Sequence, residues 1–110
     1  MVNFNHIKSA HDRISNYIHN TPVLTCENIN EEIKSSIFFK CDNFQKTGSF
    51  KIRGATNTIL QLSKEQLDNS VITTSSGNHG AAVSSTASKL GTSVRVIMPN
   101  NTPKVKVDNV

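Results

Sequence analysis

The sequence predicts an α/β fold, namely part of an open, largely parallel, three-layer sheet with helices on its faces. Three short β-prone runs alternate with helical patterns along the 110 residues, in the order strand, helix, strand, helix, strand, start of a helix. Polar, glycine-containing loops follow two of these strands, as they do where ligands bind to such sheets. Three strands leave a large apolar face uncovered, so we expect residues 1–110 to be an incomplete N-terminal unit of a larger fold.

The first predicted element is a helix from about Asn5 to Ile18. Three isoleucines and one alanine recur at helical spacing along it and form a single apolar stripe. The Asn-Thr-Pro sequence ends this helix, because the residue before Pro22 disfavours the α region. Residues 23–25 are then predicted to be extended, and residues 26–32 to form a short helix.

The central segment predicts a strand followed by two helices. Ile37–Cys41 is a compact β-prone run. A polar loop follows, and Ser49, a good N-cap residue, is expected to begin a helix that continues to about Leu62. Ser63 and Gln66 have the capping-box spacing, which predicts another short helix.

The C-terminal segment repeats the strand and helix alternation. Residues 71–74 and 94–98 are predicted strands, and residues 79–90 form the helix between them, with Gly91 at the C′ position. Thr102 can cap a last helix, in which Pro103 takes the first position.

The composition excludes several classes of protein. The net charge is +4 and the basic residues are scattered, so we expect no nucleic-acid partner. No apolar run approaches the roughly 20 residues of a membrane span, and no signal peptide begins the chain. A cytoplasmic location and reduced Cys26 and Cys41 follow as expectations. The two cysteines lack the spacing of metal ligands.

Two polar loops, residues 45–51 and 74–80, contain the best candidates for chemistry. Both precede predicted helices, whose free N–H groups and positive dipole ends favour phosphate or carboxylate groups. Lys51 lies in the first turn of its helix. From spacing alone, Lys51 is most simply a surface lysine and His79 a capping or packing histidine.

Both loops also resemble motifs of one family. Residues 44–55 resemble the cofactor-lysine motif of the serine racemase and serine/threonine dehydratase family, which are fold type II enzymes that use pyridoxal phosphate (PLP). Residues 74–80 resemble the second motif of that family. Residues 20–24 resemble its N-terminal signature, and residues 103–110 its next helix. The resemblance covers nearly the whole chain and implies the PLP fold of the tryptophan synthase β type, with PLP as cofactor.

The resemblance assigns roles to particular residues. Lys51 would hold the cofactor and exchange a proton on one face of the substrate. Phe50 would pack beside the cofactor ring, and Asn78 would hydrogen-bond the ring hydroxyl. Ser75, Asn78 and His79, with N–H groups of their loop, would bind the carboxylate of a small amino-acid substrate.

Ser76 separates the activities that the resemblance implies. Racemases of this family have serine at this position, where it exchanges a proton on the face opposite the lysine, and dehydratases usually have alanine. Ser76 therefore favours a serine racemase that eliminates serine to pyruvate and ammonia as a side reaction. The first alternative is an L-serine/L-threonine dehydratase. The second, of another class, is a truncated non-catalytic chain without PLP, favoured if the polypeptide ends at Val110, since the family's phosphate-binding loop lies beyond that residue.

The resemblance leaves activation of the full-length form open. Lys46 and Thr47 match the nucleotide contacts of animal racemases, whereas Ala81 stands where those enzymes have glutamine. ATP and Mg²⁺ are therefore candidate activators, and the metal ligands of the family lie beyond residue 110. The resemblance also implies a homodimer.

Overall fold

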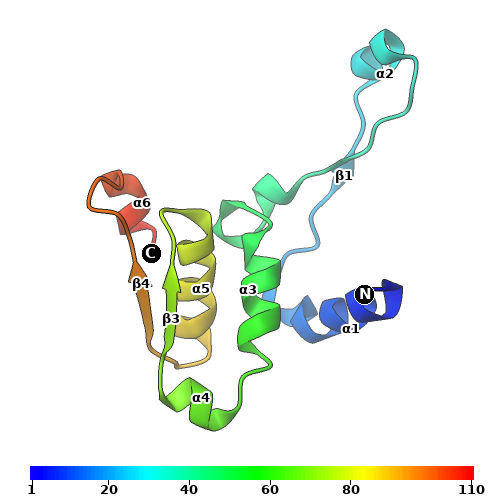
Figure 1. Cartoon of the computed structure of the whole chain (residues 1–110). Helices are drawn as coiled ribbons and strands as arrows, with labels where there is room; N and C mark the ends of the chain where they lie inside the picture. The colour runs from blue at the N-terminus through cyan, green and yellow to red at the C-terminus, as the bar shows by residue number, and fades with distance from the viewer.

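A parallel βαβ unit and a second helix packed on it form the centre of the molecule. The computed structural model describes residues 1–110. Strands β3 (Val71–Thr74) and β4 (Val94–Ile97) pair in parallel, and helix α5 (Asn78–Lys89) connects them. Helix α5 packs on both strands and on helix α3 (Lys51–Ile59), as Figure 1 shows. This arrangement confirms the predicted α/β class.

Helices α3 and α5 are held together by a small apolar core with one polar contact. The core residues are Ile52, Ala55, Ile59, Ala82 and Val83. Within this interface the buried hydroxyls of Thr56 and Thr86 lie 2.9 Å apart and form a hydrogen bond. Both helices begin at the same end of the unit, the upper end in Figure 1. The packing therefore brings the two polar loops to one end of the molecule.

Two helix-end signals in the sequence are confirmed. The Ser63 hydroxyl accepts a hydrogen bond from Gln66 N at 3.2 Å, and Gln66 Oε1 accepts one from Ser63 N at 2.8 Å. This capping box begins helix α4 (Lys64–Asp68). Gly91 has φ +67° directly after the C-cap of α5, a conformation that favours glycine.

The first helix, α1, is shorter than predicted and covers Phe4–Ile14, with a 3₁₀ turn over Ser15–Tyr17. It begins earlier than predicted because Asn3 caps it, with Asn3 Oδ1 accepting from His6 N at 3.1 Å. It ends earlier at Ser15, whose hydroxyl donates to the Asp12 carbonyl at 3.1 Å and competes with the regular helical pattern. None of the helices combines the length and apolar character needed to cross a membrane.

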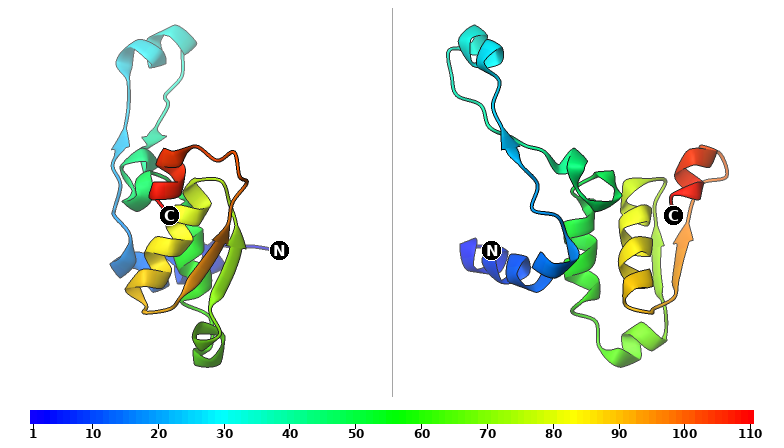
Figure 2. Two further views of the ribbon diagram at one scale, coloured as in Figure 1. Left: turned by 90° about the vertical axis from the view of Figure 1, so that its left-hand side faces the viewer. Right: turned by 180° about the vertical axis from the view of Figure 1, so that it is seen from behind.

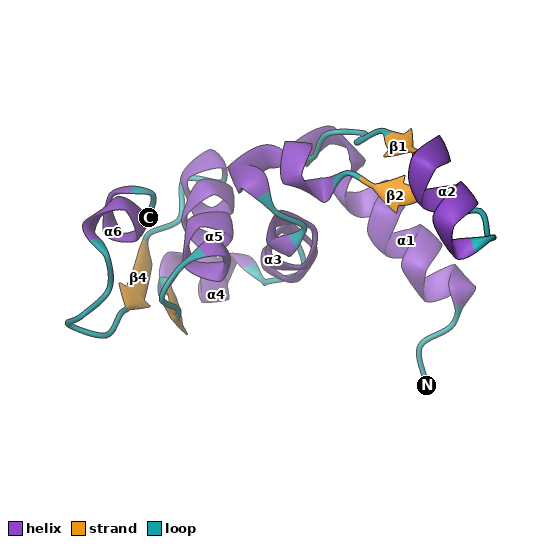
Figure 3. Cartoon of the chain, turned by 90° about the horizontal axis from the view of Figure 1, so that it is seen from above, coloured by secondary structure: helices purple, strands orange, loops and turns teal.

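An arm formed by strand β1 (Val23–Leu24), helix α2 (Glu27–Ile33) and strand β2 (Phe39–Lys40) extends from the central unit. Figures 2 and 3 show this arm on the far side of α3 from the β3–β4 sheet. The three predicted strands therefore do not share one sheet. β2 is shorter than the predicted strand and pairs antiparallel with β1, because the chain folds back on a segment close in sequence.

Two predicted helix starts are displaced by one residue. Ser49 is not the N-cap of α3: it is extended, Phe50 takes the N-cap position, and Lys51 is the first helical residue. Pro103 is the N-cap of helix α6 (Lys104–Asp108), not its first helical residue. The Thr102 hydroxyl donates to the Pro99 carbonyl and so closes the preceding turn.

The exposed apolar surface predicts that residues 1–110 associate when they are produced alone. Ile72 and Ile97, on one face of the β3–β4 sheet, are 62% and 54% exposed. The radius of gyration is 16.8 Å, whereas a compact chain of this length has about 13 Å. We expect oligomers and dye binding to exposed apolar surface. Sedimentation velocity tests this prediction, and a monodisperse monomer with a sharp cooperative melt would contradict it.

Candidate active site

Lys51 presents a free amine at the N-terminus of α3. Its side chain is exposed, and Nζ lies 4.7 Å from the centroid of the Phe50 ring. No hydrogen bond or ion pair engages Nζ. The amine is therefore free to react with a carbonyl group.

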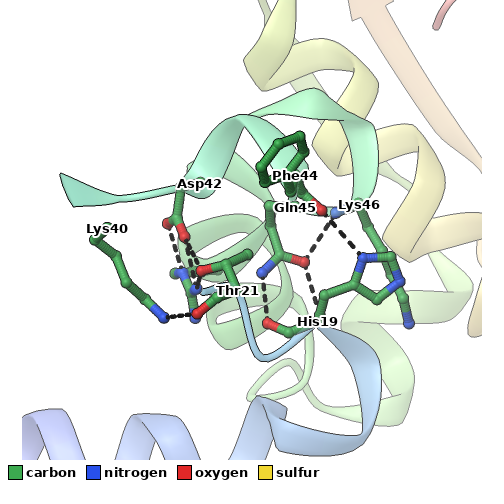
Figure 4. A network of polar contacts seen from close by, with 8 residues as sticks. His19, Thr21, Lys40, Asp42, Phe44, Gln45 and Lys46 are labelled. Carbon is green, nitrogen blue, oxygen red and sulfur yellow. Dashed lines mark hydrogen bonds and ion pairs between the residues drawn. The ribbon is translucent and has the colours of Figure 1, made fainter. Parts of the chain in front are cut away.

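Gln45 fixes the loop that precedes Lys51. Its side chain is 4% exposed and bonds both the N–H and the carbonyl of His19 at 2.8 Å, as Figure 4 shows. The same Oε1 accepts from Lys46 N at 2.8 Å. Thr47 then has φ +63°, which is unusual for a β-branched residue, and Gly48 follows with φ +70°. The tight turn is therefore anchored to the segment after α1.

A second polar network ties this loop to the helix of Lys51. Arg53 donates from two nitrogens to the two carboxylate oxygens of Asp42, each at 2.8 Å, and the Thr21 hydroxyl donates to Oδ1 at 2.7 Å. The guanidinium hydrogen bonds lower the pKa of Asp42 to about 2, and Thr21 and Lys40 also lower it, against an opposing effect of burial. Figure 4 shows the carboxylate among these donors. Arg53 follows Lys51 by two residues, so the network restrains the start of α3.

This network predicts a pH-dependent contribution to stability. The pKa of Asp42 is depressed in the folded state, so its contribution is complete above about pH 4 and is lost as the pH falls through about 2. Asp42→Asn should lower the unfolding free energy of the complete protein by about 1–2 kcal/mol at pH 7, a value reduced for the partial exposure of the pair. Urea unfolding at several pH values tests this. A difference from wild type that stays constant between pH 4 and 2 would contradict the assignment.

The loop before α5 holds three free N–H groups at one helix N-terminus. The Ser75 hydroxyl accepts from Gly77 N at 3.1 Å and from Gly80 N at 2.9 Å, which uses both of its lone pairs. The N–H groups of Ser76, Asn78 and His79 have no acceptor. Together with the helix dipole they form a site suited to a carboxylate.

Gly80 allows α5 to approach the sheet closely. A Cβ at this position would lie 3.0 Å from Val96 Cγ1 and 3.3 Å from Ser75 Cβ. A larger residue would require these neighbouring side chains to shift by a few tenths of an ångström.

Lys51 and His79 line the same hollow, of about 420 Å³, between α3 and strand β3. Its remaining lining is mostly apolar: Phe50, Gly54, Ala55, Thr58, Ile59, Val71, Ile72, Thr73 and Val83. His79 Nε2 lies 3.1 Å from Thr73 Oγ1. This volume and this combination of an apolar wall with few polar groups are typical of cofactor sites. A free amine beside an aromatic ring and an anion-binding helix N-terminus fits a cofactor with a reactive carbonyl group and negative charge.

A second hollow of about 410 Å³ also borders the α5 N-terminus. Thr47, Gly77, Asn78, Ala81, Lys106 and Asn109 line it. Asn78 and Thr47, which the sequence assigned to different ligands, thus face the same space, whereas Lys46 does not line it. Lys46 lies near Lys89, and burial and then the Lys46 charge lower the pKa of Lys89. Ser76 is exposed on the loop and lines neither hollow.

The structure adds residues that the sequence did not single out. Gln45, the Asp42–Arg53 pair and Thr73 position the predicted groups, and Lys106 joins the second hollow. Gln45 lies within the first motif and could have been suspected, whereas the contacts of Asp42 and Thr73 depend on tertiary structure. Cys26 and Cys41 are free thiols, and no cluster of three or more His, Cys, Asp or Glu side chains could hold a metal ion.

The free amine of Lys51 at one helix N-terminus and the free N–H groups at the next fit an enzyme that holds a carbonyl cofactor on lysine. Residues 14–110 match the family described as pyridoxal-phosphate dependent enzymes. The chain therefore belongs to the family of pyridoxal-phosphate-dependent enzymes.

The most similar proteins include several serine racemases. The chain is 53% identical over 104 residues to serine racemase of Arabidopsis thaliana, and 48% identical over 109 residues to that of Dictyostelium discoideum. These alignments cover 94% and 99% of the chain, but 31% and 34% of the relatives. The structure of maize serine racemase matches 99% of the chain and 33% of its own length, with a TM-score of 0.94 and 44% identity. The chain thus spans about a third of the relatives' length.

Proposed function

We propose that the complete protein is a PLP-dependent serine racemase that interconverts L- and D-serine, with elimination of serine to pyruvate and ammonia as a side activity. The observation that carries the proposal is the placement of Lys51 and the Ser76 loop at one end of two packed helices. The similarity to serine racemases from plants and an amoeba supports it. Racemisation needs a proton donor or acceptor on each face of the substrate, and Lys51 and Ser76 would supply one each.

Lys51 and Ser76 divide the proton transfers between them. Nζ of Lys51 would hold the cofactor and, once the substrate amine has taken its place there, would take the α-proton of L-serine on one face. The Ser76 hydroxyl returns a proton on the opposite face, which inverts the configuration. When bound, PLP would supply an electron sink at Cα. Loss of the neighbouring β-hydroxyl group would account for the side reaction.

The remaining candidate residues bind and orient. The apolar ring of Phe50 packs against the cofactor ring, and Asn78 hydrogen-bonds the cofactor hydroxyl. The free N–H groups of Ser76, Asn78 and His79 receive the substrate carboxylate. Ser75, which the sequence assigned to the carboxylate, supports it through the loop, because its hydroxyl donates to the Gly77 carbonyl at 3.4 Å and accepts from Gly77 N and Gly80 N.

A dehydratase is the second candidate, and one observation favours it. The chain is 43% identical over 102 residues to the β-hydroxyaspartate dehydratase of Paracoccus denitrificans. A dehydratase needs Lys51 but no proton on the opposite face. The ratio of D-serine to pyruvate therefore distinguishes the two activities.

We further propose a cytoplasmic homodimer whose activity responds to ATP and Mg²⁺. The polar hollow lined by Thr47, Lys106 and Asn109 offers donors suited to a nucleotide, with Lys46 adjacent in sequence. Ala81 leaves this hollow without the glutamine of animal racemases, so a weak response is expected.

The test is to incubate the complete protein with L-serine and PLP and to measure D-serine and pyruvate in the same reaction, with and without ATP and Mg²⁺. We expect both products. Pyruvate without D-serine would replace the racemase proposal by the dehydratase, and neither product from a PLP-loaded protein would contradict both.

A further inference from the structure

Thr73 and His79 form a contact that no assigned role uses. Thr73 lies in strand β3, six residues before His79, and its Oγ1 is 3.1 Å from His79 Nε2. Both side chains line the hollow that contains Lys51. We propose that Thr73 is a positioning residue that orients the His79 imidazole and sets its tautomer for binding the substrate carboxylate. This inference rests on the proposed function.

The strand makes Thr73 a rigid anchor. Its backbone is paired with Val96 of β4 in the parallel ladder. A β-branched side chain has little χ1 freedom, so the hydroxyl keeps one direction. His79 is exposed at the second position of α5. An exposed imidazole without this bond would sample several rotamers, and binding would have to restrict them.

The hydrogen-bond pattern favours one tautomer in the ligand-bound state. The Thr73 hydroxyl has no other partner, and neither does His79 Nδ1. When the hydroxyl donates to Nε2, the neutral imidazole carries its proton on Nδ1. Nδ1–H is then a donor, as a carboxylate requires. The opposite tautomer would present a lone pair to the anion. A bound carboxylate therefore favours Nδ1–H, and the Thr73 hydroxyl stabilises this form by donating to Nε2.

The experiment compares Thr73→Val with Thr73→Ser in the PLP-loaded complete protein. Valine keeps the shape and removes the hydroxyl, and serine keeps the hydroxyl. We expect Thr73→Val to raise KM for L-serine about 3- to 10-fold, the value of one neutral hydrogen bond, with kcat changed by less than about twofold. Thr73→Ser should recover most of the loss. Thr92→Val, the same change at a residue outside the site, is the matched control and should leave KM unchanged.

Two further measurements separate positioning from a structural effect. In a His79→Gln background, Thr73→Val should have no additional effect on KM, since the two residues act together. The ¹⁵N chemical shifts of the His79 ring, assigned by loss of the signal in His79→Gln, should report a proton on Nδ1 with L-serine bound. Thr73→Val should shift these resonances toward a tautomer mixture.

The outcomes distinguish this inference from the proposed function. If the protein racemises serine but Thr73→Val leaves both KM and the ring shifts unchanged, the inference is wrong and the function stands. If the protein lacks serine chemistry, the function is wrong, and the ring shifts of wild type and Thr73→Val still decide whether Thr73 sets the tautomer. Additive increases of KM in the double variant would also overturn the inference about Thr73.

Discussion

Lys51→Ala should abolish the visible absorption of lysine-bound PLP in the complete protein and lower D-serine and pyruvate formation by at least about 1,000-fold. The amine has no other partner in the structure, so the substitution removes no structural contact beyond its position over Phe50. It removes both the cofactor attachment and one acid–base group, and such a group alone contributes up to about 10⁴ in rate. Absorbance spectra and rates of both products measure the effect.

Lys64→Ala is the matched control, because Lys64 is also the first residue of an exposed helix N-terminus, that of α4. It should keep the spectrum and both activities. Unchanged absorption in Lys51→Ala would show that another lysine holds the cofactor.

Ser76→Ala should suppress D-serine formation by at least about 100-fold, the lower range of one positioned acid–base group. Elimination should fall less, because Lys51 still takes the α-proton on its own face. The loop should keep its shape, since Ser75, not Ser76, makes its internal hydrogen bonds. D-serine and pyruvate measured in one reaction provide the comparison with wild type.

Equal losses of the two products in Ser76→Ala would mean that Ser76 holds the substrate carboxylate or the loop and transfers no proton. Ser75→Ala is the informative companion variant. It should weaken binding of L-serine and affect both products alike, because it releases the N–H groups of Gly77 and Gly80 from their common acceptor.

Local signals predicted the parts of the fold that depend on sequence neighbours. The capping box at Ser63, the glycine after α5 and the alternation around β3 and β4 each need only a few adjacent residues. The extended segment, the helix and the strand of the arm were predicted, but the sheet to which the strand belongs was not, because β propensity does not identify a pairing partner. Residues 37–41 have the pattern of a strand in the main sheet, but β2 pairs with β1, through Val23 with Lys40 and Leu24 with Phe39.

The sequence motifs predicted the reactive residues of the site, but not the contacts that hold those residues in place. Lys51 at the start of α3 and the polar loop before α5 followed from the sequence. The Ser75 contacts, the Gln45 bridge and the Thr73–His79 bond join residues through tertiary structure, which neither periodicity nor motif spacing encodes. That Asn78 and Thr47 line one hollow likewise depends on tertiary structure.

The central claim is that Lys51 holds PLP, and borohydride reduction of the complete protein followed by peptide mass spectrometry tests it most directly. Reduction fixes the cofactor to the lysine that holds it. We predict a single modified peptide that contains residues 46–53, with the added mass on Lys51. A cofactor adduct on any other lysine, with Lys51 unmodified in a protein that absorbs as PLP-loaded, would contradict this account.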